Sequence, residues 1–222
     1  MGDFLLDDFL GPRRRMVESQ LVARGITDER VLAAMGKVPR HRFTAPGYID
    51  MAYSDMALPS SEEQTVSQPY MVAIMTELLA LKGDERVLEV GTGSGYQTAV
   101  LAELAGEVYT IEYRPNLAAE AKRRLEGLGY GNIRFMTGDG SRGWPEQAPY
   151  QGILVTAAAP DVPPPLVEQL DEGGVIVIPV GQRQSQRLLK IGKRGGRLIR
   201  EYHIFCVFVP LLGDYGWPDA NE

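Results

Sequence analysis

A glycine loop between a β-rich run and a helical stretch sharply limits the folds open to this chain. The run covers residues 86–90, and the loop Gly91-Thr92-Gly93-Ser94-Gly95 follows it directly. Glycine suits such a loop because a Cβ would hinder the tight turn and keep the backbone away from a ligand. Open α/β sheets bind their ligands at this place, outside the carboxyl ends of the strands. The loop therefore predicts a ligand site on an α/β sheet.

Short apolar runs alternate with helical stretches after Gly83. Strands are expected at 86–90, 107–111, 133–136, 153–156 and 175–180, and helices at 98–105 and 115–128. This alternation favours a doubly wound, mostly parallel Rossmann-like sheet. Residues 187–191 and 197–209 flank a Lys-Arg-Gly-Gly turn, which predicts an antiparallel hairpin at one edge.

The first 83 residues are expected to form a helical and irregular extension. Helices are predicted over 13–24 and 28–35, each followed by a glycine that suits a helix C-terminus, and over 69–81. Residues 38–65 carry prolines and aromatic residues without periodicity, as functional loops often do. We therefore expect a substrate-covering segment, 1–83, and a cofactor-binding core, 84–222, within one structural unit.

Acidic residues follow the next two expected strands. The loop has the spacing G-x-G-x-G, because Tyr96 stands where a dinucleotide fingerprint requires glycine. Glu112 ends the second strand, where an acid can accept both ribose hydroxyl hydrogens, and Asp139 lies in a Gly-Asp-Gly turn after the third. Each feature alone is weak, but their order predicts an adenosyl-cofactor site. The glycine spacing resembles motif I of the class I methyltransferases, which bind S-adenosylmethionine.

Two longer blocks of sequence point to one family. They are Gln64-Thr65-Val66-Ser67-Gln68-Pro69-Tyr70-Met71-Val72 and Val87-Leu88-Glu89-Val90-Gly91-Thr92-Gly93-Ser94-Gly95-Tyr96-Gln97-Thr98-Ala99. With shorter matches through residues 207–211, they closely resemble the protein-L-isoaspartate O-methyltransferases, and the Ser-Gln-Pro block is the specific part. The resemblance implies transfer of a methyl group from S-adenosylmethionine to the free carboxylate of an isoaspartyl residue in a damaged peptide or protein. The ester then collapses to a succinimide, which hydrolyses partly to normal aspartate.

The resemblance also implies the site residues. Ser67 corresponds to the family's active-site serine, and Thr65 is a weaker candidate for the same substrate pocket. The cofactor pocket is expected to involve Glu89, Gly91, Thr92, Gly93, Gly95, Glu112, Asp139 and Gly140.

The expected chemistry needs no general base. A carboxylate with a reference pKa of about 4 is already ionised at pH 7. The chain has only two histidines, His41 and His203, and this scarcity is no obstacle to the reaction because no proton has to be removed. The catalytic task is to align the reactants and exclude water. We expect Ser67 to orient the carboxylate, although its place just before Pro69 also suits a helix N-cap. Cys206 is expected to be an inert buried thiol, and the run of arginines from Arg13 a solvated helix face.

One segment departs from the family pattern. Many members have Ile-Gly after Leu-Pro, whereas this chain has Ser60-Ser61-Glu62-Glu63. Two acids near a pocket for an anionic group would repel it modestly, so the peptide preference is expected to be affected.

Composition restricts the remaining function classes. The formal charge of −6 and the pI near 5.1 disfavour nucleic acid as a partner. One cysteine and no apolar run of membrane-spanning length favour a cytoplasmic protein, expected to be a monomer without a bound metal. The alternatives are a methyltransferase for another carboxylate, a small molecule or RNA, a nicotinamide-dependent oxidoreductase, and a cofactor-binding module without catalysis.

Overall fold

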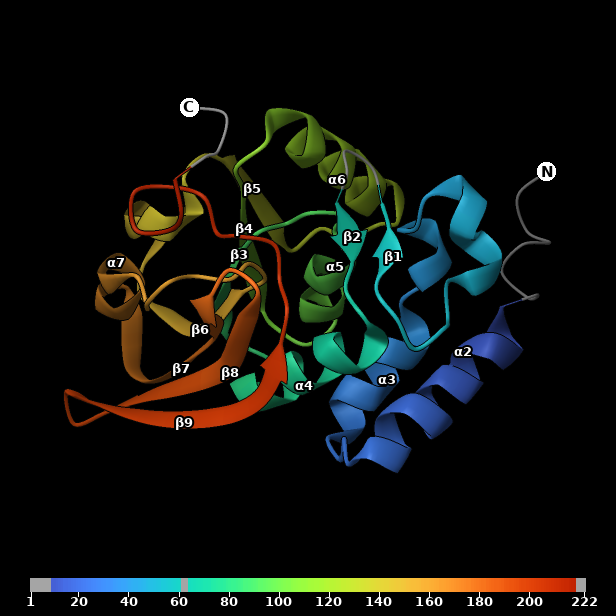
Figure 1. The fold of residues 1–222 in the computed structure, drawn as a ribbon, viewed down its shortest axis with the longest axis horizontal. Coiled ribbons are helices and arrows are strands. Elements are labelled where there is room, and N and C mark those ends of the chain that lie inside the picture. The colour runs from blue at the N-terminus through green and yellow to red at the C-terminus, as the bar shows by residue number, and fades with distance from the viewer. Residues whose placement is uncertain (1–8, 61–63, 219–222) are drawn as a thin grey trace.

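A seven-stranded sheet forms the centre of the computed structural model, which describes residues 9–60 and 64–218 (Figure 1). Along the sheet the strand order is β5-β4-β3-β6-β7-β8-β9. The bounds are β3 Arg86–Val90, β4 Glu107–Glu112, β5 Ile133–Thr137, β6 Tyr150–Val155, β7 Leu170–Gln182, β8 Ser185–Arg194 and β9 Arg197–Cys206.

Strands β3 to β7 are parallel, and β8 and β9 run antiparallel to their neighbours. The loops after β3, β4, β5 and β6 therefore meet at one edge of the sheet. Both turn residues of the β8–β9 hairpin, Gly195 and Gly196, have positive φ angles, which glycine adopts without steric cost. The predicted doubly wound sheet and its edge hairpin are confirmed.

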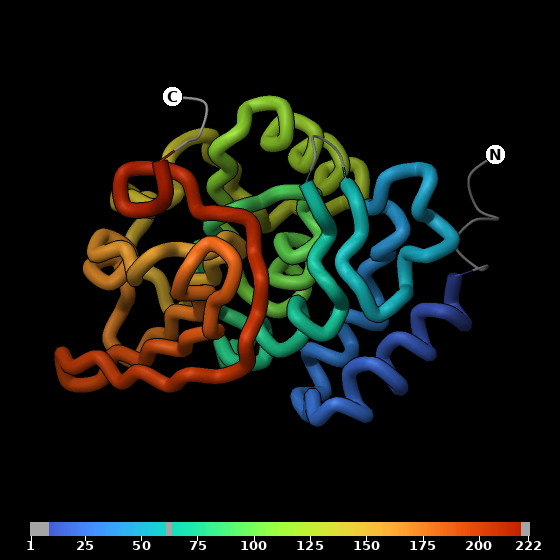
Figure 2. Tube along the Cα trace, viewed as in Figure 1, coloured from blue at the N-terminus to red at the C-terminus, as the bar shows by residue number. Residues whose placement is uncertain are grey.

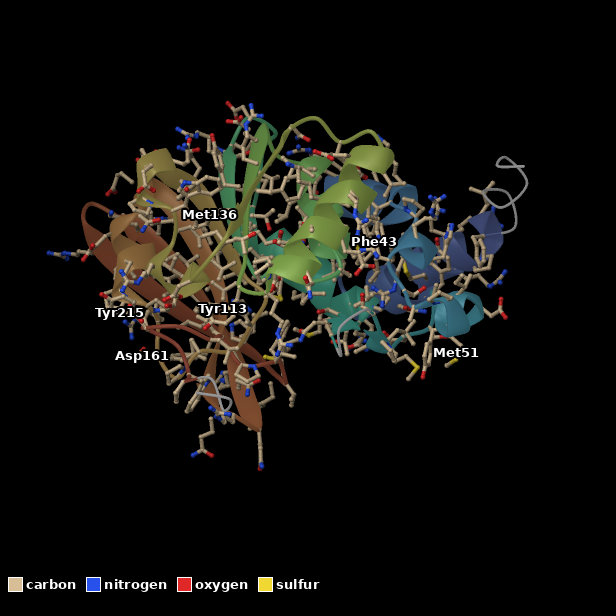
Figure 3. All side chains as sticks on the ribbon, turned by 90° about the horizontal axis from the view of Figure 1, so that it is seen from above. Phe43, Met51, Tyr113, Met136, Asp161 and Tyr215 are labelled. Atoms are coloured by element: carbon tan, nitrogen blue, oxygen red, sulfur yellow. The ribbon has the colours of Figure 1, made fainter. Side chains whose placement is uncertain are left out.

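Apolar side chains pack on both faces of the sheet. One face carries α4 (Pro69–Leu79), α5 (Tyr96–Ala102) and α6 (Pro115–Gly127), and their shared core also contains side chains from the N-terminal helices. The other face carries α7 (Pro164–Glu168), whose Leu166 is fully buried there. Phe43 of the N-terminal extension lies against this helical layer, edge-on to Tyr96 with ring centroids 5.5 Å apart (Figure 3).

The N-terminal extension is helical and irregular, as predicted. Helix α2 (Leu10–Met16) continues through a π-helical segment, Val17–Leu21, and a 3-10 turn, Val22–Arg24, and ends at Gly25 with φ +90°. After α3 (Glu29–Lys37) come 3-10 turns at Arg40–Arg42 and Pro46–Met51, and a short hairpin of β1 (Leu58–Pro59) and β2 (Thr65–Val66).

Several helix boundaries differ from the predicted ones, and three of them have a clear local cause. Helix α3 is Glu29–Lys37, so Gly36 lies inside it. The helix stops before Val38, which is extended because a residue before proline is disfavoured in the helical conformation. Helix α4 ends two residues early because Ala80 takes a left-handed conformation. Helix α5 begins two residues early, since Gly95 turns the chain into it with φ +88°.

Arg13 does not belong to a solvated face. It is 6% exposed and donates to the Tyr53 hydroxyl and the Lys37 carbonyl oxygen, so only Arg14 and Arg15 face outward.

No helix in the described ranges is both long and apolar enough to cross a bilayer.

Candidate active site

A cavity of about 940 Å³ opens at the edge of the sheet where the parallel strands end. We call it the carboxyl-edge cavity. Its wall combines the ends of β3, β4, β5 and β6 with parts of segments 55–57, 64–68 and 205–212. Figure 2 shows the red trace after β9 rising across the sheet, while β1 and β2 stand beside it. Its volume lies at the upper end of the range for small-molecule sites.

The glycine loop forms the floor of this cavity. Gly91 has φ +97°, and its amide donates to the Ile111 carbonyl oxygen at 2.8 Å. A Cβ at Gly91 would overlap the hydroxyl of Thr156, which itself donates to the Gly91 carbonyl oxygen at 2.5 Å. At Gly93, by contrast, a Cβ would meet no protein atom within 4 Å and would project into open space. Glycine is thus required for packing at Gly91 and keeps space free at Gly93.

Glu112 links the loop to the second strand end. Its Oε2 accepts a hydrogen bond from the Gly93 amide at 2.8 Å, and its Oε1 accepts one from the Arg114 amide at 3.0 Å. The side chain is 7% exposed and lines the carboxyl-edge cavity. A carboxylate has about four acceptor positions, so each oxygen keeps capacity for one more donor. Glu112 therefore keeps one acceptor position on each oxygen at the cavity wall.

Glu89 lies behind the loop and does not line the cavity. Its Oε2 accepts from the hydroxyls of Thr98 and Thr110, each at 2.6 Å, and Thr110 also pairs with the Thr92 hydroxyl at 2.6 Å. Burial is complete and raises the pKa of Glu89 to about 8. At neutral pH this acid is protonated, and it connects the loop to β4 and α5 from beneath.

The third strand end is held by the C-terminal segment. Asp139 accepts from the Ser141 amide and hydroxyl and, through Oδ2, from the Asp214 amide at 2.9 Å. Gly140 lines the carboxyl-edge cavity, whereas Asp139 and Gly95 lie outside its wall. Asp139 thus fixes the turn that presents Gly140.

Ser67 faces the cavity between β2 and α4. The N-cap of α4 is Gln68, so the interpretation of Ser67 as the helix cap is wrong. Within residues 9–60 and 64–218 the Ser67 hydroxyl has no hydrogen-bond partner, while the Gln68 side chain donates to Asp55 Oδ1 at 2.8 Å. Thr65 lines the same wall and is exposed. The distinctive Ser61, Glu62 and Glu63 lie outside the described residues.

Neither histidine reaches the cavity. His41 is buried beside Phe9 and Tyr53, and burial, with Arg13 and Arg42, lowers its pKa to about 4. His203 lies on β9, away from the cavity wall. Across the described chain, no group of three His, Cys, Asp or Glu residues is placed to hold a metal ion.

Several residues in the cavity wall, and one behind it, were not predicted. Thr156 follows β6, and its position at the end of a fourth parallel strand was a signal that could have found it. Arg124 supports the loop from α6 by donating to the Ser94 carbonyl oxygen at 2.6 Å, a contact without a sequence signal. Phe205 and Val207 also line the cavity and are 75% and 74% exposed. Cys206 between them is half-buried, not fully buried, and burial raises its pKa to about 11.

Comparison with known proteins gives one consistent result. The family model for protein-L-isoaspartate(D-aspartate) O-methyltransferase matches residues 13–216. A protein-L-isoaspartate O-methyltransferase from Dictyoglomus turgidum is 55% identical over 216 residues, covering 96% of this chain and 98% of that protein. A second, from Geotalea uraniireducens, is 56% identical over 206 residues, covering 92% and 95%.

Solved structures agree with the sequence matches. One protein-L-isoaspartate O-methyltransferase superposes with a TM-score of 0.84 at 32% identity, covering 92% of this chain and 67% of that one. A Plasmodium falciparum structure assigned to the same enzymes, in complex with S-adenosyl-L-homocysteine, gives a TM-score of 0.78 at 25% identity, covering 90% and 98%.

Proposed function

The chain belongs to the protein-L-isoaspartate(D-aspartate) O-methyltransferase family, and we infer from this membership that it methylates the free carboxylate of isoaspartyl residues with S-adenosylmethionine as donor. The product is a neutral methyl ester. Loss of methanol closes the ester to a succinimide, which hydrolyses partly to normal aspartate. The observation that carries this function is the match of the family model to residues 13–216, which includes the wall of the carboxyl-edge cavity except for Pro218.

The residues at the strand ends fit the cofactor. The open space at Gly93 admits a ligand against the backbone, and Glu112 keeps acceptor capacity for the two ribose hydroxyls. We assign Gly91, Thr92, Gly93, Glu112 and Gly140 to direct contact, and Glu89, Gly95 and Asp139 to holding these contacts in place. When bound, S-adenosylmethionine supplies an electrophilic methyl group on a positively charged sulfur.

The task of the remaining residues is to orient an anion. The substrate carboxylate is ionised at neutral pH, so no proton has to be removed, and the cavity wall contains no histidine among the described residues. The Ser67 hydroxyl has no hydrogen-bond partner among residues 9–60 and 64–218, and it can donate to a carboxylate oxygen. Segments 55–57 and 64–68 cover the same space and reduce the access of water.

Methyl transfer to a matched pair of peptides tests this function. One peptide contains isoaspartate and its twin contains ordinary aspartate. Wild type is expected to methylate only the first. Ser67→Ala is expected to lower kcat/KM by about 10- to 100-fold, because a hydrogen bond to a charged group contributes about 1.5–3 kcal/mol.

The control is Ser19→Ala, which removes an exposed hydroxyl on the N-terminal helices and should leave kcat/KM unchanged. Calorimetric titration with S-adenosylhomocysteine should give the same affinity for all three proteins. Equal methylation of both peptides by wild type would exclude the repair function. Full activity of Ser67→Ala would remove only the role of Ser67.

The setting of the reaction is part of the same proposal. We propose that the protein is a monomer in the cytoplasm. We also propose that it acts on peptides and proteins and not on nucleic acid, because its net charge of −6 disfavours binding to a phosphate backbone. We also propose that residues 1–83 cover the substrate and that 84–222 bind the cofactor. Core packing between the two parts supports their acting as one unit.

A further inference from the structure

Arg40 has no role in the proposed reaction so far. It lies directly behind the part of the cavity wall that carries Met56 and Ser67. Its Nε donates to the Ala52 carbonyl oxygen at 2.7 Å. Its Nη2 lies 3.3 Å from the Met56 carbonyl oxygen and 3.5 Å from that of Val66. Met56 lines the cavity, and the Val66 carbonyl belongs to the peptide bond that leads into Ser67.

The guanidinium of Arg40 is buried without a counter-charge among the described residues. The side chain is 0% exposed, and Nη1 has no hydrogen-bond partner there. The ring of Tyr96, another residue of the cavity wall, lies 4.9 Å from the guanidinium carbon. Burial lowers the pKa of Arg40, and the hydroxyls of Tyr96 and Tyr53, which are neutral at physiological pH, only partly oppose this effect. An arginine remains protonated even so, and a buried unpaired cation is costly unless an anion approaches it.

The acid next to Met56 in the sequence, Asp55, also lines the cavity and is already engaged. Asp55 pairs with Arg24 at 3.1 Å and accepts a hydrogen bond from Gln68 at 2.8 Å. Arg24 in turn lies over the ring of Tyr70, 3.6 Å from its centroid. The positive charge of Arg40 is therefore left to act on whatever occupies the space beside Ser67.

We propose that Arg40 is the counter-charge for the isoaspartyl carboxylate. It acts through the thin wall formed by Met56, Tyr96 and the Val66–Ser67 peptide bond, and it also holds the backbone that presents Ser67. This inference rests on the proposed function. It makes Arg40 a positioning and specificity residue that selects an anionic side chain over a neutral one of the same shape.

The charge argument predicts which kinetic constant changes. The carboxylate is fully charged in the bound substrate but partly neutralised in the transition state. A fixed cation therefore stabilises bound substrate more than the transition state. Removing the charge should raise KM without lowering kcat.

The test compares an isoaspartyl peptide with its isoasparaginyl twin, which carries a neutral amide in place of the carboxylate. Calorimetry measures both dissociation constants with S-adenosylhomocysteine present. Wild type is expected to prefer the anionic peptide, and Arg40→Gln to lose about tenfold of that preference, equivalent to about 1.4 kcal/mol. Arg40→Lys, which keeps the charge, should retain most of it. Arg13→Gln is the matched control, since Arg13 is also buried in this layer but does not adjoin the cavity wall.

The outcomes separate this inference from the proposed function. Equal binding of the two twins by wild type overturns it without any variant being needed. A variant that binds both twins more weakly by the same factor would show a purely structural role and would also overturn it. Methylation of the aspartyl peptide as readily as the isoaspartyl peptide would instead contradict the proposed function, whatever Arg40 does.

Discussion

At the scale of single residues, the least usual group is the buried acid beneath the glycine loop. Glu89 is an acid by sequence, yet its side chain is fully buried and meets two threonine hydroxyls and no cation. Burial removes the carboxyl group from water and raises its pKa, whereas the two threonine hydroxyls that donate to it lower the pKa and only partly offset the effect of burial. The acid therefore organises the loop through hydrogen bonds and not through charge.

Glu89→Gln should consequently become more stable relative to wild type as the pH rises. In the unfolded chain the acid ionises near its ordinary pKa of 4.5, whereas in the folded protein it keeps its proton until about pH 8. The unfolded state thus binds fewer protons between these values, and Glu89 alone lowers the free energy of unfolding of wild type by at most about 1.4 kcal/mol per pH unit. Glutamine has the same shape and no such dependence.

Urea unfolding of both proteins at about pH 5.5, 6.5 and 7.5 measures this difference. Contributions from other groups, including the lowered pKa of His41, are common to both proteins and cancel. Glu126→Gln, an exposed change on α6, is the control and should run parallel to wild type. Parallel curves for Glu89→Gln as well would mean that Glu89 is ionised in the folded protein.

At the scale of elements, α3 shows how a local signal defines a helix. Asp28 accepts hydrogen bonds from the amides of Arg30 and Val31, at 2.9 and 3.2 Å, and so satisfies donors that the first turn leaves free. The helix then presents Met35 to the hydroxyl of Tyr96, whose ring stands beside Arg40. The start of α3 therefore supports the wall of the active site.

Replacing the cap should cost stability in a predictable way. Asp28→Ala is expected to lower the free energy of unfolding by about 1 kcal/mol, because both amides lose their acceptor. Asp28→Asn keeps an acceptor oxygen and should stay within a few tenths of a kcal/mol of wild type. Chemical denaturation of the three proteins at one pH provides the comparison. A loss in Asp28→Asn as large as that in Asp28→Ala would assign the effect to charge instead.

Helices and strands could be predicted where neighbouring residues in the sequence carry the signal. Contacts in the site could be predicted only where they lie at the ends of the parallel strands. The spacing of apolar residues located β3 to β7, and strand ends pointed to Glu112 and Gly140, since parallel strands finish at one edge. The roles of Arg40 and Arg124 were not predicted, because both side chains donate to backbone carbonyl oxygens of segments distant in sequence. A sequence does not show which carbonyl a long side chain will reach.

At the scale of the whole molecule, the N-terminal extension and the sheet share one core. Met16, Leu21 and Met35 belong to the same buried cluster as Val87, Val108 and other strand residues. The carboxyl-edge cavity is walled by both parts as well. Neither part can separate without exposing apolar surface, so we expect the protein to unfold in a single transition.

S-adenosylhomocysteine should raise that single transition as one unit. At a ligand concentration of about 100 times Kd, binding adds about 2.7 kcal/mol, which for a chain of this size raises Tm by about 5–10 °C. NAD at the same concentration should leave Tm unchanged, because Tyr96 opens α5 where a dinucleotide loop needs a further glycine. Scanning calorimetry measures both shifts and also tests whether the calorimetric and van't Hoff enthalpies agree. Two transitions, with only one moved by S-adenosylhomocysteine, would mean that the extension folds apart from the cofactor core. An increase in Tm with NAD but not with S-adenosylhomocysteine would instead support a nicotinamide-dependent oxidoreductase.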